Sequence, residues 1–287
     1  MPTPQSASDH RPPAIPQSII WRLLITDAAS GSGNMAVDEA IATFAARGES
    51  PATLRFYQWQ PGTVSLGRHQ SLADLDMERV QQLGYGVVRR ATGGRAILHI
   101  DELTYSISGT ANDAGLGGAV LDSYNQLSSG LMLGLQRLGI DAVKAPAGNR
   151  AGADASPVCF EVPSAYEITA GGRKLLGSAQ SRRSGYVLQH GSLPLTGDVA
   201  RLVDVLAVED ESQRADLRRA LAERATTLEM LMGRYVSFWE AATVLIDGLS
   251  SALGVDFTEG ELSSGELALA AELEAEKYAE ANWLLRI

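Results

Sequence analysis

The sequence predicts an α+β domain. Three observations indicate this class: short β-type runs dominate residues 20–107, a hairpin pattern returns between 164 and 195, and the chain is mostly helical from about 199 onward. Strands grouped along the chain, with helices around them, are typical of α+β folds rather than alternating α/β folds. The 287 residues are enough to bury a substantial core.

Residues 1–18 are rich in proline, serine and other polar residues, and this composition predicts a disordered leader. The rest, residues 19–287, contains no tandem repeat and no strong linker, so we expect a single catalytic domain whose last part is helical. Hydrophobic residues make up 45% of the chain and charged residues 20%, which is the ordinary globular range.

The elements of the first half are predicted in order. Residues 20–25 form an apolar strand, and a turn through Gly31 and Gly33 leads to a helix for which Asn34 is the expected cap. Asp38 and Glu39 would favour the positive end of that helix. Strand-like runs follow at 54–57 and 63–66.

The next elements are separated by clear turn signals. Asp76 begins a short helix with Met77, Val80 and Leu83 facing inward, and Gly84 ends it. Further strands are expected at 87–88, 96–99 and 103–107. The apolar spacing over residues 120–138 predicts the longest helix. Residues 147–156 have the composition of a loop, and this loop directly precedes Cys159, a position from which it could gate the thiol; whether it does so stays open.

Composition excludes several classes of function. The formal net charge is −10, from 24 Lys and Arg against 34 Asp and Glu, which argues against general nucleic-acid binding. No apolar run approaches the roughly 18 residues that span a bilayer. The single cysteine and the scattered histidines exclude a disulfide framework and zinc-ligand spacing, and a reducing cytoplasmic location is the expectation.

Cys159 and Lys174 are the candidate catalytic residues. A nearby ammonium favours the thiolate by lowering the thiol pKa below about 8.5. Two prolines, Pro157 and Pro163, favour a stiff loop around the thiol rather than a strand interior. The alternatives are a buried structural cysteine and a solvated hairpin lysine.

Other segments are candidates for substrate binding. The segments 90–99 and 190–191 combine glycines with polar side chains, and the small-residue segment 177–179 follows Lys174. In chain order, the candidate residues are Arg90, Thr92, Gly93, Gly94, Arg95 and His99; then Gly177, Ser178 and Ala179; then His190 and Gly191. Glycine-rich turns and small residues allow a ligand to approach the backbone, although a bare Gly-Gly pair is often only a turn.

At these residues the chain resembles the lipoate/biotin protein ligase and octanoyltransferase superfamily. The resemblance covers nearly all of 19–287. It is carried by 33–40, 61–67, 89–99, 101–106, 172–174 and 190–192, and by the ending Lys277-Tyr278…Asn282-Trp283. Within that superfamily, Cys-Phe-Glu-Val-Pro-Ser-Ala-Tyr-Glu-Ile at 159–168 is similar to the cysteine-dependent octanoyltransferases.

The resemblance implies a mixed β-sheet flanked by helices and a tunnel for an acyl chain. It implies that Cys159 carries an octanoyl thioester, that Lys174 lowers the pKa of this thiol, and that the glycine-rich segments line the pocket. The implied donor is octanoyl-acyl carrier protein, and the acceptor is a lysine of the glycine cleavage H protein or another lipoyl domain. Neither ATP nor a metal is expected. A basic rim of Arg173, Lys174, Arg182 and Arg183 would attract these partners, which are commonly acidic.

One departure from the related ligases favours transfer. Gly93-Gly94-Arg95 stands where ATP-dependent lipoate ligases usually carry three glycines, and those ligases lack a cysteine at the position of Cys159. Three other functions stay open at this point: an ATP-dependent lipoate ligase, an octanoyl amidotransferase acting between lipoyl domains, and a non-catalytic acyl-binding protein.

Overall fold

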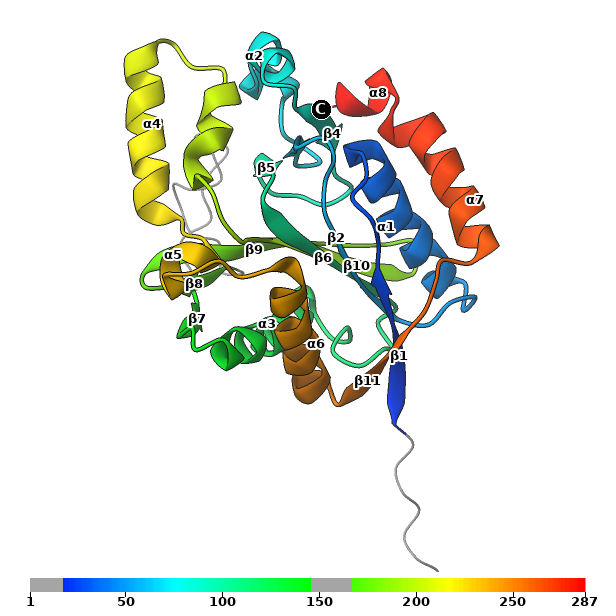
Figure 1. Cartoon of the computed structure of the whole chain (residues 1–287). Coiled ribbons are helices and arrows are strands. Elements are labelled where there is room, and N and C mark those ends of the chain that lie inside the picture. The colour runs from blue at the N-terminus through cyan, green and yellow to red at the C-terminus, as the bar shows by residue number, and fades with distance from the viewer. Residues whose placement is uncertain (1–17, 146–166, 287) are drawn as a thin grey trace, which may run out of the picture.

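A computed structural model describes residues 18–145 and 167–286. It contains an eight-stranded sheet with helices on both sides and a separate three-stranded sheet (Figure 1). In the large sheet the pairs β1–β11 and β1–β2 are parallel, whereas β2–β6, β6–β10 and β10–β9 are antiparallel. The predicted α+β class with a mixed sheet is confirmed.

The strands of the large sheet lie in the order β11-β1-β2-β6-β10-β9-β8-β7. Their bounds are β1 Ile19–Ile25, β2 Thr53–Tyr57, β6 Glu102–Gly109, β7 Ala142–Lys144, β8 Ile168–Ala170, β9 Arg173–Arg183, β10 Tyr186–Pro194 and β11 Val255–Glu259. The small sheet has the order β4-β3-β5, with β3 Thr63–Leu66, β4 Gly86–Arg89 and β5 Ile97–His99.

The helices are α1 Gly31–Ala46, α2 Met77–Gln82, α3 Val120–Arg137, α4 Glu211–Arg224, α5 Leu228–Met232, α6 Phe238–Leu253, α7 Ser264–Leu273 and α8 Ala281–Leu284. Short 3₁₀ helices span Leu72–Asp74 and Val199–Val205, and a π-helical turn spans Glu274–Tyr278. Helices α3 and α6 pack against each other on one side of the large sheet, while α1 and α7 lie on its other side (Figure 1). None of the helices in these ranges is long and apolar enough to cross a membrane.

One face of the large sheet builds the main core. Alternate residues of β6, namely Leu103, Tyr105 and Ile107, join a buried apolar cluster with Leu127 of α3 and Leu245 of α6. Successive side chains of a strand point to opposite faces, so this face is apolar because every second residue is apolar. The intervening residues of β6 are polar and point to the other face, where the candidate site lies.

Two local predictions were wrong in detail. Helix α1 is capped by Ser30, whose side chain accepts from the Gly33 N–H, and not by Asn34. Asn34 lies inside the helix and is fully buried. Its side-chain amide donates to the carbonyl of Ala29, ahead of the helix, and to the carbonyl of Gln58, which follows β2. In α2, Val80 is buried as expected, but Met77 and Leu83 are exposed, because one short helix buries only a narrow stripe.

The C-terminal helix α8 is tied to the small sheet through Arg89, a fully buried residue. Its guanidinium donates to the carbonyls of Trp283 and Leu284 on one side and to those of Gly67 and Gln70 on the other. The Trp283 ring nitrogen donates back to the Arg89 carbonyl at 2.9 Å. Strand β4 and the loop after β3 are thereby joined to the end of the chain, which supports the segment that follows Arg89.

Candidate active site

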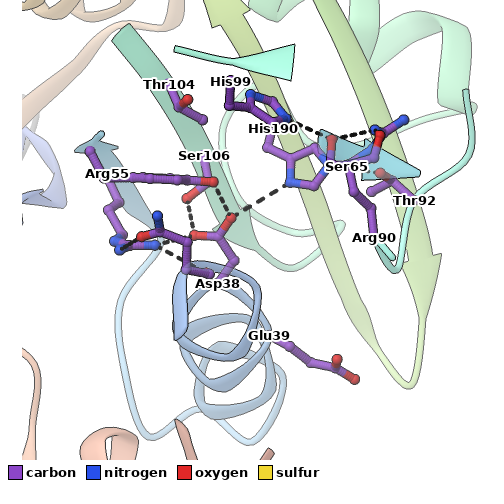
Figure 2. Close-up of polar contacts among 12 residues, drawn as sticks. Asp38, Glu39, Arg55, Ser65, Arg90, Thr92, His99, Thr104, Ser106 and His190 are labelled. Atoms are coloured by element: carbon purple, nitrogen blue, oxygen red, sulfur yellow. Dashed lines mark hydrogen bonds and ion pairs between the residues drawn. The ribbon is translucent and has the colours of Figure 1, made fainter. Parts of the chain in front are cut away.

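A row of polar side chains crosses the second face of the large sheet. Strand register places Ser106 of β6 opposite His190 of β10 and opposite Arg55 of β2. All three side chains are buried. Helix α1 covers this face and brings Asp38 onto the row (Figure 2).

The Asp38 carboxylate is the centre of this arrangement. It accepts from Arg55 Nη1 at 2.8 Å, Ser106 Oγ at 2.7 Å and the Tyr57 hydroxyl at 2.8 Å. Its Oδ2 lies 3.6 Å from Nδ1 of His190. Burial by itself raises the pKa of Asp38, but interactions with His190 and Arg55 outweigh it and hold the pKa below its ordinary value. Asp38 is therefore an ionised carboxylate inside the protein.

His190 is neutral at physiological pH. Burial lowers the pKa of its imidazole, and the nearby Asp38 carboxylate only partly opposes that effect. Its second nitrogen, Nε2, lies 2.7 Å from the Thr92 hydroxyl. Asp38, His190 and Thr92 thus form a row of polar contacts from α1, by way of His190 on β10, to the glycine-containing loop after β4.

The lowered pKa of His190 predicts a loss of stability in mild acid. Because the folded protein binds this proton less readily than the unfolded chain, stability falls as pH drops below about 6.5. The melting temperature should therefore fall more between pH 7.5 and pH 5.5 in the wild type than in a His190→Gln variant, measured by differential scanning calorimetry. Equal losses in the two proteins would contradict this assignment.

Arg90 shapes the loop that follows it. One terminal nitrogen donates to the carbonyl and hydroxyl of Ser65 at 2.7 and 2.6 Å, and the other donates to the carbonyls of Gly93 and Arg95 at 2.9 and 3.0 Å. Arg90 is buried, whereas Gly93 and Gly94 are exposed. The buried arginine therefore holds the exposed glycine backbone in place through hydrogen bonds to its carbonyls.

The same loop presses against the loop after β3. A Cβ atom at Gly67 would lie 1.9 Å from the carbonyl oxygen of Gly94, so only glycine permits this approach. Gly94 itself has a φ of +95°. Both positions of this contact depend on glycine, and the loop conformation follows from them.

A second buried network centres on His99. Its Nδ1 donates to the Glu102 carboxylate at 2.7 Å, its Nε2 lies 2.6 Å from Ser65 Oγ, and its ring stacks on Trp59 at 4.1 Å. The order serine, histidine, carboxylate is that of a nucleophile relay. Ser65, however, is completely buried within β3 and accepts from Arg90, so this network is structural.

Lys174 lies beside a cavity at the other end of this face. Its ammonium nitrogen is 2.5 Å from a carboxylate oxygen of Glu167, and both side chains are largely buried. The cavity is open to the surface and holds about 680 Å³ of space including its open mouth. Its apolar walls include Ile97, Leu98, Ile100, Leu175 and Leu202, and its polar lining includes Lys174, Glu102 and Ser192.

The structure places the predicted residues in several different surroundings. Gly177 lines the cavity with Lys174, and Ala179 lies opposite His190 in the strand register. Arg90, Thr92, His99 and His190 belong to the two networks (Figure 2). Cys159 and the predicted loop 147–156 lie outside the described residues.

Two predicted residues lie on the opposite face of the sheet. The Ser178 hydroxyl is 2.7 Å from the Tyr105 hydroxyl, on the side of α3. A Cβ atom at Gly191 would lie 2.5 Å from the Tyr105 ring. Strand alternation explains both positions, because neighbours of Gly177 and His190 must point away from the site.

The predicted basic rim does not form one patch. Arg173 and Lys174 begin β9, whereas Arg182 and Arg183 end it, about 30 Å away along an extended strand. The Arg182 guanidinium is also engaged with the carbonyls of Leu116 and Gly118 ahead of α3. The strand therefore separates the basic residues into two pairs.

The sequence reasoning missed Arg55, Glu102 and Glu167 as residues of this region, and it assigned Asp38 only to the helix end. One signal was available: polar residues at 102, 104, 106 and 108 alternate with apolar ones along β6 although the whole strand is buried. A buried polar face must satisfy its hydrogen bonds internally, and such networks often support sites.

Comparisons with known proteins agree with this geometry. The family model described as Lipoyl protein ligase A/B catalytic domain matches residues 30–250. Proteins named octanoyltransferase LipM from Kyrpidia tusciae and Moorella thermoacetica are 43% and 42% identical to this chain over 271 and 269 residues. Each alignment covers 93% of this chain and 98% of the relative.

Solved structures show the same architecture. A bipartite lipoate protein ligase from Thermoplasma acidophilum, described together with its E2 lipoyl domain, has a TM-score of 0.78 and 26% identity, covering 94% of this chain and 98% of that one. A lipoate-protein ligase A bound with ATP has a TM-score of 0.76 and 26% identity, covering 93% and 99%.

Proposed function

Because the chain belongs to the lipoyl protein ligase A/B catalytic domain family, we propose that it transfers an octanoyl group to a lysine of a lipoyl-dependent protein through a thioester on Cys159. The observation that carries the proposal is the similarity, over nearly the full length of both chains, to proteins named octanoyltransferase LipM. A cavity with apolar walls beside Lys174 supports it, because an octanoyl chain needs such walls.

The proposed reaction has two steps. The Cys159 thiolate attacks the carbonyl carbon of an octanoyl thioester on acyl carrier protein, and the carrier thiol leaves and takes up a proton. The amine of an acceptor lysine, on the H protein or another lipoyl domain, then attacks the acyl-cysteine. An amide forms, the amine loses its proton, and the Cys159 thiolate is regenerated. Covalent catalysis divides one exchange into two easier ones.

The residues of the site have proposed roles in these steps. Lys174 favours the Cys159 thiolate by its charge, and Gly177 with the apolar walls receives the acyl chain. The exposed backbone of Gly93 and Gly94 faces the substrate, and Arg90 together with the Thr92–His190 contact holds that backbone. Because the thioester donor is already activated, these steps require neither ATP nor a metal ion.

A second candidate function has a specific observation in its favour. One of the similar structures is a lipoate-protein ligase A bound with ATP, the nucleotide that activation of a free acid by adenylation would use. A ligase would need ATP and free lipoate or octanoate, whereas the transferase needs neither.

The deciding experiment is intact-mass analysis of the protein after mixing with octanoyl-acyl carrier protein in the absence of ATP. Transfer predicts an octanoyl adduct on the enzyme that hydroxylamine removes and that disappears when H protein is added, with octanoyl-H protein as the product. Labelling of H protein only when ATP and free octanoate are supplied would contradict the proposal and favour the ligase. Octanoylated H protein used as the donor tests the amidotransferase separately.

A further inference from the structure

The Lys174 ammonium is held at one place by three features of the fold. The first is Glu167, whose side chain is 6% exposed and whose carboxylate oxygen lies 2.5 Å from Lys174 Nζ. Glu167 is fixed through its own backbone, since its carbonyl accepts from the Ala145 N–H at 2.8 Å. The carboxylate therefore reaches Lys174 from a backbone that is hydrogen-bonded beside the β7–β8 pair.

The second feature is the absence of a side chain at Gly177. A Cβ atom there would lie 3.0 Å from Lys174 Cε and 3.2 Å from its Nζ, closer than ordinary van der Waals contact. The lysine side chain thus extends along the strand and lies over the Gly177 backbone, three residues after Lys174. Gly177 therefore leaves room for the Lys174 side chain in addition to lining the cavity.

The third feature is the backbone of Lys174 itself. Its carbonyl accepts from the Thr226 N–H at 2.9 Å, and the β8–β9 register shifts between Ile168 and Thr169. A register shift changes the face to which following side chains point. Together these contacts direct the Lys174 side chain toward the Glu167 carboxylate. Lys174 also lines the cavity at this position.

We propose that Glu167 is a positioning residue that holds the Lys174 ammonium over Gly177 at the edge of the acyl cavity. The inference rests on the proposed function, in which Lys174 acts on the reacting thiol. A lysine side chain has four rotatable bonds, so an unrestrained ammonium spends little time at one point. A buried carboxylate at hydrogen-bond distance selects one arrangement. Glu167 touches neither substrate nor reacting atoms in this role.

The test uses the pH dependence of thiol reactivity, which a purely structural salt bridge would leave unchanged. Cys159 is the only cysteine in the chain, so alkylation by iodoacetamide, followed by intact mass from pH 5 to 9.5, reports that thiol alone. In the wild type we expect a midpoint below the ordinary value of about 8.5. In Glu167→Ala the midpoint should rise toward that of Lys174→Ala, and octanoylation at pH 7 should slow about tenfold.

Two further variants separate position from charge and from folding. Gly177→Ala keeps both charges but displaces Lys174, so its midpoint should also rise. Glu167→Gln keeps a hydrogen-bond acceptor, so it should retain more of the octanoylation rate than Glu167→Ala. Glu266→Gln is the matched control, because Glu266 of α7 is a fully buried carboxylate paired with Arg22 of β1, and three strands separate β1 from the β9 strand that carries Lys174. It should lower the melting temperature and leave the alkylation midpoint unchanged.

The outcomes separate the positioning role of Glu167 from the proposed function. If Lys174→Ala raises the midpoint but Glu167→Ala and Gly177→Ala do not, the positioning role is overturned and the proposed function stands. If Lys174→Ala changes neither the midpoint nor the octanoylation rate, the proposed role of the lysine fails, whatever Glu167 does. Should Glu167→Ala not fold, the Gly177→Ala midpoint decides.

Discussion

Replacing Cys159 by alanine should abolish octanoyl transfer from carrier protein to H protein. The nucleophile of the proposed first step is then gone, and the loss should be on the order of 10³-fold or more in single-turnover rate. The hydroxylamine-sensitive mass adduct should disappear at the same time. The measurement is intact mass of enzyme and acceptor, quenched at intervals after mixing.

The matched variant for this experiment is Cys159→Ser. A hydroxyl is a far weaker nucleophile than a thiolate at neutral pH, so transfer should be slow, and any adduct should be an oxygen ester that resists hydroxylamine better than a thioester. Undiminished transfer by Cys159→Ala would exclude the covalent mechanism. Binding of octanoyl-carrier protein by the wild type without any adduct would favour an acyl-binding protein instead.

Replacing Asp38 by alanine should produce the largest loss of stability among single substitutions in the site. Breaking a buried ion pair by removing one partner costs about 3–5 kcal/mol, because the other charge stays buried without its partner. Here the remaining charge is the Arg55 guanidinium, which is 2% exposed. The hydroxyls of Tyr57 and Ser106 lose their acceptor as well.

Chemical denaturation in urea at pH 7 measures this loss as a change in the free energy of unfolding. The control is Glu211→Ala, which removes an exposed carboxylate that pairs with Arg79 and Arg214, and whose effect should be far smaller. Adding Arg55→Met to Asp38→Ala should recover part of the loss, since the orphaned charge is then gone. An Asp38→Ala loss no larger than that of the control would show that the network does not stabilise the fold.

Elements with strong local patterns were predictable from the sequence. The apolar repeat over 120–138 corresponds to α3 at Val120–Arg137, and the predicted strand 103–107 lies within β6. Strand β11 was not predicted. It pairs in parallel with β1, more than 200 residues earlier in the chain. A local sequence pattern does not predict pairing between strands that far apart.

The candidate site was predictable only in part. Resemblance to a family identified the segments with Arg90, Thr92, His99 and His190, but not what their side chains contact. Asp38 shows why. In the sequence it is an acidic residue near the start of a helix, and its actual role depends on the strands that α1 covers. Only the register of β2, β6 and β10 brings Arg55, Ser106 and His190 under one carboxylate.

The sequence by itself determined the class of the fold, the family of the chain and the segments that we propose carry its chemistry, because these depend on local periodicity and on residue types in a fixed order. The tertiary structure decided which side of each strand faces the site, and so placed Ser178 and Gly191 away from it and Glu167 against Lys174. The physical reason is that strand register and helix docking are set by packing over the whole domain, and a shift of one residue exchanges the two faces of a strand.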